Sequence, residues 1–87
     1  MKTFNLDCPN EAQNFISKYG TQTGRFLAGR LGFKGKGSVK KANALSEYAW
    51  NKCTAIRARE EGNIRVANIY ENICERIYNR MPDDIKW

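Results

Sequence analysis

The residues best suited to chemistry lie in one ten-residue stretch, GFKGKGSVKK, at residues 32–41. It holds four lysines, three glycines and no acid. Glycines let backbone N–H groups approach a phosphate closely, and lysine ammonium groups supply countercharge. The stretch runs into a predicted helix, whose first N–H groups and dipole also favour anions. We therefore interpret residues 32–38 as a flexible basic loop that binds an anionic partner.

This loop does not match the phosphate-binding loop of nucleotide hydrolases. That motif reads G-x-x-x-x-G-K-[ST] and lies between a strand and a helix. Counted from Gly29, the second glycine of the motif falls on Lys34, and no strand is predicted before it. The spacing therefore argues against nucleotide hydrolysis.

Catalytic groups are scarce elsewhere in the chain. There is no histidine, which removes the commonest general base at neutral pH. The adjacent acids Glu60 and Glu61, and likewise Asp83 and Asp84, cannot converge on one substrate atom from neighbouring positions. We therefore expect a protein that is not an enzyme and needs no cofactor.

The three cysteines, Cys8, Cys53 and Cys74, are widely spaced and form no metal-binding pattern. They indicate reduced thiols, no bound metal and a cytoplasmic location. No apolar run approaches the roughly 20 residues that a membrane-spanning helix needs, and the N-terminus does not resemble a secretory signal. We therefore expect no membrane partner.

Charge is distributed unevenly along the chain. The formal net charge is +6, but residues 12–46 carry seven basic residues and no acid, whereas the remainder carries eight basic and nine acidic residues. The basic residues of this segment are Lys18, Arg25, Arg30, Lys34, Lys36, Lys40 and Lys41. Such asymmetry favours a polyanionic partner.

Hydrophobic spacing predicts four helices in one domain over residues 1–87. The predicted boundaries are Asp7 or Cys8 to Gly20, Thr21 or Thr23 to Gly32, Ser38 to Gly62, and Asn63 to Pro82. Before the first helix, residues 1–7 are predicted to form an extended arm, and residues 83–87 a short tail. Two long helices joined by a short turn must pack antiparallel. The prediction is an all-α fold in which two short N-terminal helices cap a long antiparallel hairpin.

The predicted core follows one apolar face of each helix. On the second helix this face is assigned to Phe26, Leu27 and Leu31. On the two long helices it is assigned to Ala42, Leu45, Ala49, Cys53 and Ile56, and to Val66, Ile69, Tyr70, Ile73, Ile77 and Met81.

Residues 23–45 resemble a helix-turn-helix unit, which binds DNA. Ala28, Gly32 and Val39 occupy the positions of that family's small residue, turn glycine and β-branched residue. The turn is about one residue longer here. The resemblance implies that the third helix enters a major groove, with Lys40, Lys41 and Asn43 near bases or backbone, and that the protein is a homodimer.

The C-terminal half is similar to one tetratricopeptide helical hairpin, through Gly62-Asn63-Ile64 and then Ala67, Tyr70 and Cys74. Only one such unit is present, whereas a solenoid needs several stacked repeats. This resemblance therefore concerns packing and implies no function.

Two functions follow as hypotheses. The first is a small basic protein that binds DNA or another nucleic acid through residues 25–43, using Arg25, Arg30, Lys34, Lys36, Lys40, Lys41 and Asn43. The second is a small regulator or inhibitor, of the type that phages and mobile elements encode, which binds an acidic surface or a nucleic-acid channel of a host protein. Trp50 and Arg57, on the polar face of the third helix, and the terminal Trp87 are candidate contacts for such a partner.

Overall fold

The computed structural model describes residues 4–87, which form four α-helices and one short 3-10 helix. The elements are α1 Pro9–Tyr19, α2 Gly24–Arg30, α3 Ser38–Glu60, α4 Ile64–Arg80 and η1 Asp83–Ile85. These described residues contain no β-strand, so the predicted all-α class and the number of helices are confirmed. Of the arm predicted over residues 1–7, positions 1–3 lie outside the described residues. None of the described helices combines the length and apolarity needed to cross a membrane.

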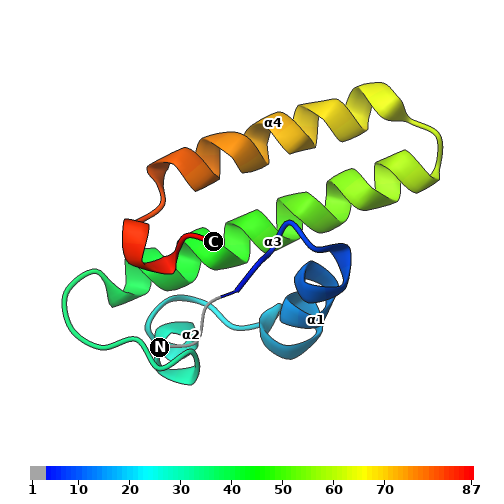
Figure 1. The fold of residues 1–87 in the computed structure, drawn as a ribbon. Coiled ribbons are helices and arrows are strands. Elements are labelled where there is room, and N and C mark those ends of the chain that lie inside the picture. Colours follow the sequence, from blue (N-terminus) through cyan, green and yellow to red (C-terminus); the bar gives the residue numbers. More distant parts are fainter. Residues whose placement is uncertain (1–3) are drawn as a thin grey trace.

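Helix α3 is the centre of the fold. Helix α4 returns antiparallel along it, and α1 and α2 pack against α3 on the side away from α4 (Figure 1). The short helices thus lie along α3, which refines the prediction that they cap one end of the hairpin. This arrangement arises because α3 is buried over most of its length, from Ala42 to Ala58.

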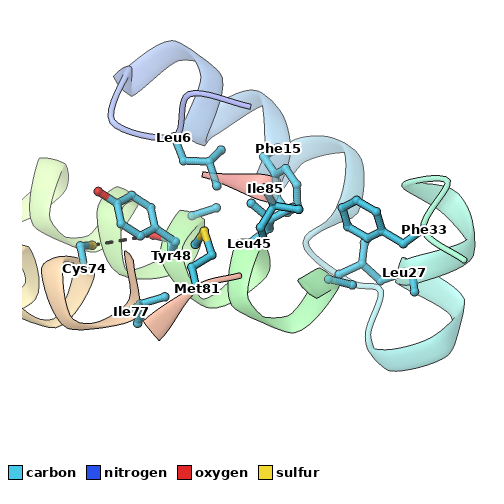
Figure 2. Packing of buried hydrophobic residues seen from close by; sticks show 13 residues of the cluster. Leu6, Phe15, Leu27, Phe33, Leu45, Tyr48, Cys74, Ile77, Met81 and Ile85 are labelled. Atoms are coloured by element: carbon cyan, nitrogen blue, oxygen red, sulfur yellow. Dashed lines mark hydrogen bonds between the residues drawn. The ribbon is translucent and has the colours of Figure 1, made fainter. Parts of the chain in front are cut away.

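The core joins all four helices and both ends of the described chain. Figure 2 shows Leu27 and Phe33 together at one end of this core, with Tyr48, Cys74 and Ile77 further along α3 and α4. From the two ends of the chain, Leu6 is fully buried and Ile85 is 3% exposed. Burying each large apolar side chain contributes about 1.5–3 kcal/mol, so both ends stabilise the fold.

The turn between α3 and α4 forms as the sequence predicts. Gly62 has a φ of 80°, a left-handed conformation that glycine adopts without the strain of a Cβ. The Asn63 N–H donates to the Ala58 carbonyl at 2.8 Å, and the Asn63 side chain accepts from the Val66 N–H at 3.3 Å. The predicted stop at Gly62 and cap at Asn63 are therefore confirmed.

The start of α3 differs from the prediction by one residue. Gly37, with a φ of 82°, is the N-cap, and Ser38 is the first helical residue rather than the cap. The Ser38 N–H donates to the Gly35 carbonyl at 3.3 Å. This tight turn brings the chain into helical geometry one residue earlier than the serine signal indicates.

The buried faces of two helices are rotated from the predicted ones. In α2, Leu27 and Ala28 are buried, whereas Phe26 is 69% exposed. In α4, Ala67, Cys74 and Ile77 are buried, whereas Ile69 is 51% exposed. Placing Phe26 and Ile69 in the core was therefore wrong. Phe33, from the loop after α2, is buried beside Leu27 and fills the space that Phe26 was expected to occupy (Figure 2).

The predicted tail over residues 83–87 is docked on the protein. Ile85 of η1 is buried, and the Trp87 ring packs edge-on against Tyr48 and Tyr78 with centroid distances of 4.8 and 4.9 Å. The Tyr78 hydroxyl donates a hydrogen bond to the Trp87 carbonyl. Aromatic packing therefore fixes this segment against α3 and α4.

Candidate nucleic-acid interface

The basic segment forms α2, the following loop and the start of α3, and these three elements make the surface at one end of the molecule (Figure 1). The Gly24 N–H donates to the Asn43 side-chain oxygen at 3.3 Å, which holds the beginning of α2 beside the second turn of α3. At its other end α2 is followed by Gly32, whose φ is 82°, and the Phe33 N–H donates to the Ala28 carbonyl at 3.0 Å. The loop is thus attached to the core at Phe33 before it runs on to α3.

Five cations on this surface are exposed, and we call them the basic surface. They are Arg25, Arg30, Lys34, Lys36 and Lys40. None of the five forms a salt bridge with an acid among residues 4–87. The first turn of α3 also lacks an acid, so the positive end of its helix dipole adds to the same field. Five of the seven residues that the sequence selects for nucleic-acid contact are therefore exposed and outside any salt bridge within residues 4–87.

Lys41 differs from its neighbour Lys40. Its ammonium group forms a salt bridge with Asp84 of η1, and the Lys41 side chain is only 23% exposed. Residues 12–46 contain no acid, but the docked C-terminal segment places Asp84 beside Lys41. Lys41 anchors that segment and is not an open cation.

Asn43 is exposed, but its side-chain oxygen is used within the fold. That oxygen accepts the Gly24 N–H, and a bidentate contact with adenine would need both the oxygen and the amide nitrogen. We therefore assign Asn43 the role of aligning α2 with α3.

An exposed aromatic ring lies within the basic surface and was not expected there. Phe26 lines a shallow hollow together with Arg25, Gly29 and Arg30, and no acid lines it. The Arg30 guanidinium lies 5.7 Å from the centroid of the Tyr19 ring, a cation–π contact that steadies Arg30 at the edge of the hollow. The sequence gives little signal for this, because Phe26 adjoins the buried Leu27.

A groove adjoins the basic surface where α3 begins and α4 ends. Lys40, Asn43 and Glu47 line it from α3, and Ile77 and Arg80 line it from α4. Sequence reasoning missed Arg80. The antiparallel hairpin was the available signal, because it places the last turn of α4 beside the first turns of α3.

The three candidate protein contacts have different environments. Trp50 is 48% exposed, and together with Arg57 it lines a hollow between α1 and α3. The Trp50 ring also packs against Gly20, where an added Cβ would lie 3.2 Å from the indole. Trp87 is half-buried, and its indole N–H donates to Asp7 at 2.9 Å. Trp50 and Arg57 therefore share one surface, whereas Trp87 is part of the fold.

A second charged region, which we call the Asp7 cluster, joins the N-terminal arm to both long helices and the C-terminus. It consists of Asp7, Tyr48, Lys52, Glu71 and Trp87. The Tyr48 hydroxyl and the Trp87 indole donate to Asp7, and the Lys52 ammonium lies 2.9 Å from Glu71 and 3.6 Å from Asp7. Every charge in this cluster thus has an opposite charge or a hydrogen-bond donor within contact distance.

The pKa values of the cluster reflect this pairing. Burial acts to raise the pKa of Asp7, but the hydrogen bonds from Tyr48 and Trp87 and the charge of Lys52 outweigh it and hold that pKa below its ordinary value. Burial, and then the bond to Asp7, raises the pKa of Tyr48. Burial acts to lower the pKa of Lys52, yet Glu71 and Asp7 raise it overall. The nearby Cys74 thiol, which donates to the Tyr48 carbonyl at 3.8 Å (Figure 2), has its pKa raised to about 11 by burial.

No metal centre is formed within the described part of the chain. Among residues 4–87, no group of three or more histidine, cysteine, aspartate or glutamate side chains lies close enough to hold a metal ion. Cys8 and Cys53 are partly exposed, Cys74 is buried, and all three are free thiols.

The unit that resembles a helix-turn-helix contains its two helices in the expected order. The connector from Leu31 to Gly37 is seven residues long between the ends of α2 and α3. A helix-turn-helix turn spans about 3–4 residues, so the connector exceeds it by about three residues or more and not by the one residue expected from the sequence. The extra length accommodates the inward-facing Phe33 and two left-handed glycines, Gly35 and Gly37.

Comparison of the chain with protein-family models, with curated proteins and with solved structures gives no match.

Proposed function

We propose that this protein binds nucleic acid through the basic surface. The observation that carries the proposal is the exposure of five cations on α2, the loop and α3 that form no salt bridge within residues 4–87. Glu47 lines the adjoining groove with Lys40 but is not paired with it. A surface of one sign attracts a polymer of the other sign and releases the counterions condensed on it.

The arrangement suits contact with a phosphate backbone. The loop lysines stand between two helices that are fixed to each other by Gly24 and Asn43, so cations from three elements face one ligand. Three glycines with positive φ, Gly32, Gly35 and Gly37, keep the loop free of bulky side chains other than lysine and the inward-facing Phe33. Phosphate contacts of this kind set affinity and orientation and do not by themselves read sequence.

The test is a salt series with fluorescein-labelled 20-mers of duplex DNA, single-stranded DNA and RNA, followed by anisotropy. Each phosphate contact contributes about 0.9 to the slope of log affinity against log salt on duplex DNA and about 0.7 on single strands. Five contacts therefore predict a slope of up to about 4.5 or 3.5 respectively. Absence of binding to all three probes at 50 mM salt would exclude the proposal.

A second candidate function is supported by one observation on the surface between α1 and α3. Trp50 is 48% exposed and lies with Arg57 along the hollow between α1 and α3, and tryptophan and arginine are the residues most enriched among binding hot spots. This surface would suit a protein partner of the kind that a small regulator binds. The test compares W50A with K40A in capture from nuclease-treated lysate. Loss of a captured protein only in W50A supports this function, and equal capture by both variants and wild type argues against it.

A further inference from the structure

Phe26 is the feature of the basic surface that phosphate binding alone does not explain. Its side chain is 69% exposed, the largest exposed fraction among the large apolar residues of the described chain. An exposed phenylalanine forgoes the stabilisation of about 1.5–3 kcal/mol that burial would give. The same helix buries Leu27 and Ala28, so α2 does hold a core position while presenting this ring to solvent.

The residues around the Phe26 ring suit both parts of a nucleotide, the base and the phosphate. The hollow that it lines also includes Arg25, Gly29 and Arg30, so two guanidinium-bearing residues and a glycine adjoin the ring. An added Cβ at Gly29 would meet nothing within 4 Å, so the space above this helix face is open. An aromatic face between two cations offers stacking to a base and ion pairs to the flanking phosphates.

The position of Arg30 is fixed before any ligand arrives. Its guanidinium lies over the Tyr19 ring at 5.7 Å from the centroid, and Tyr19 closes the last turn of α1. Pre-positioning of this kind reduces the side-chain entropy that is lost when a ligand binds. All four residues that line the hollow belong to α2, and the Tyr19 ring of α1 supports one of them, Arg30.

We infer that Phe26 is a stacking platform for an unpaired base, and that the preferred ligand of the basic surface is single-stranded nucleic acid. In a duplex both faces of each base are covered by neighbouring base pairs, so a protein ring of this kind can stack only on a base that is unstacked or at an end. The inference rests on the proposed function and adds to it the class of nucleic acid that is bound.

The experiment compares two fluorescein-labelled 12-mers, oligothymidylate and an abasic oligomer with the same number of phosphates, by anisotropy at 50 mM salt. The wild type is expected to bind oligothymidylate about 5- to 100-fold more tightly than the abasic oligomer, the range that one or more base–aromatic stacks produce. Phe26→Ala removes this difference, because it leaves the phosphate contacts and deletes the ring. Phe26→Tyr restores it. Ile69→Ala, which trims a similarly exposed apolar side chain (51%) on α4, leaves the difference unchanged.

Each other outcome overturns the inference and identifies what failed. Equal binding of both oligomers by the wild type shows that only phosphates are recognised, and the proposed function then stands without the stacking platform. An equal loss of affinity for both oligomers in Phe26→Ala shows that the ring supports the surface and does not stack. If a poly-glutamate peptide of the same charge competes as strongly as oligothymidylate does, the result indicates a protein partner. Absence of binding to either oligomer and to duplex DNA removes the proposed function as well. A thermal melt of Phe26→Ala, expected to match the wild type, shows that the variant is folded.

Discussion

The molecule contains two charged regions built from similar residues and organised in opposite ways. In the Asp7 cluster, Lys52 contacts both Asp7 and Glu71, and Asp7 also accepts hydrogen bonds from Tyr48 and Trp87. On the basic surface, five cations are exposed and have no acidic partner within residues 4–87. The first region is satisfied internally, and the second leaves its charge available to an outside ligand.

The two regions differ in which segments of the chain their charged residues connect. The Asp7 cluster links segments distant in sequence, since 80 residues separate Asp7 from Trp87, and its charges hold these segments together. The basic surface draws on neighbouring segments whose geometry is already fixed by glycines and by the buried Phe33. Its cations form no salt bridge within residues 4–87, so removing them should affect binding far more than stability.

The largest expected effect is on binding when the basic surface is neutralised. The variant R25Q/R30Q/K34Q/K36Q/K40Q should lose at least about 100-fold in affinity for single-stranded DNA at 50 mM salt, because up to five counterion-releasing contacts are deleted. Its free energy of unfolding should fall by no more than about 1 kcal/mol, because the five cations form no salt bridge within residues 4–87 and the cation–π contact of Arg30 with Tyr19 is an exposed one. Anisotropy and urea denaturation measure the two quantities.

The control for this prediction removes charge at the α3–α4 turn, which lies at the other end of the hairpin from α2 and the loop (Figure 1). Arg59 and Arg65 are exposed on either side of this turn, and R59Q/R65Q lowers the net charge without touching the basic surface. Its affinity should change less than about threefold, since charges beyond a Debye length of about 10 Å are largely screened. A similar loss per charge in both variants would mean that net charge, and not this surface, governs binding.

The second effect is on stability and concerns the Asp7 cluster. Asp7→Ala should lower the free energy of unfolding by about 1–3 kcal/mol, because the Tyr48 hydroxyl is buried and loses its acceptor. Affinity for nucleic acid should not change. Asp83→Ala is the matched control, since the Asp83 side chain is 95% exposed and its ion pair within the described residues is with Lys86 at 3.3 Å. Equal stability of both variants in urea would show that the cluster contributes nothing to folding.

The third effect is the pH dependence of that stability. The pKa of Asp7 is lowered in the folded protein, so its contribution is present above the unfolded value of about 3.9 and is lost as pH falls through the folded pKa. The pKa values of Tyr48 and Lys52 are raised, so their contributions are present below about 10 and are lost as pH rises through the folded values. Urea midpoints between pH 2 and 11 should fall at both ends. In Asp7→Asn the acidic decline should be smaller, and an unchanged acidic decline would contradict the assignment to Asp7.

Much of this fold could be predicted from the sequence because its local signals agree with its tertiary structure. Pro9, Gly20, Gly62 and Asn63 mark helix ends, and each lies where the structure places one. The errors occur where packing between distant segments decides. Phe26 and Ile69 fit a helical apolar face, but Phe33 from the loop, and Ala67 and Cys74 on α4, take the buried positions instead.

The charge of the candidate site could be predicted from the sequence, but the full set of residues that form it could not. Because the basic segment is contiguous in sequence, five of its cations could be found by counting charges. The pairing of Lys41 could not, because its partner Asp84 is 43 residues away and reaches it only through the docked η1 segment. The exposure of Phe26 could not be predicted either, because it depends on Phe33, which the sequence pattern assigns to a loop.

The smallest expected effect separates two adjacent lysines that the sequence cannot distinguish. Lys40 is exposed and lines the groove beside Arg80, whereas Lys41 is bound to Asp84. Lys40→Ala should lower the salt slope on single-stranded DNA by about 0.7, the share of one phosphate contact, and should leave stability unchanged. Lys41→Ala should leave the slope unchanged and lower the free energy of unfolding by no more than about 1 kcal/mol, as expected for a largely surface ion pair.

The variant Asp84→Asn completes this pair, because it frees the Lys41 ammonium without removing it. If the salt bridge with Asp84 keeps Lys41 from contacting phosphate, Asp84→Asn should add up to one phosphate contact. The salt slope should then rise by up to about 0.7. The double variant Lys41→Ala/Asp84→Asn should return the slope to the wild-type value. A slope that falls as much in Lys41→Ala as in Lys40→Ala would show that both lysines contact phosphate, and the boundary between the two charged regions would then have to be moved to include Lys41.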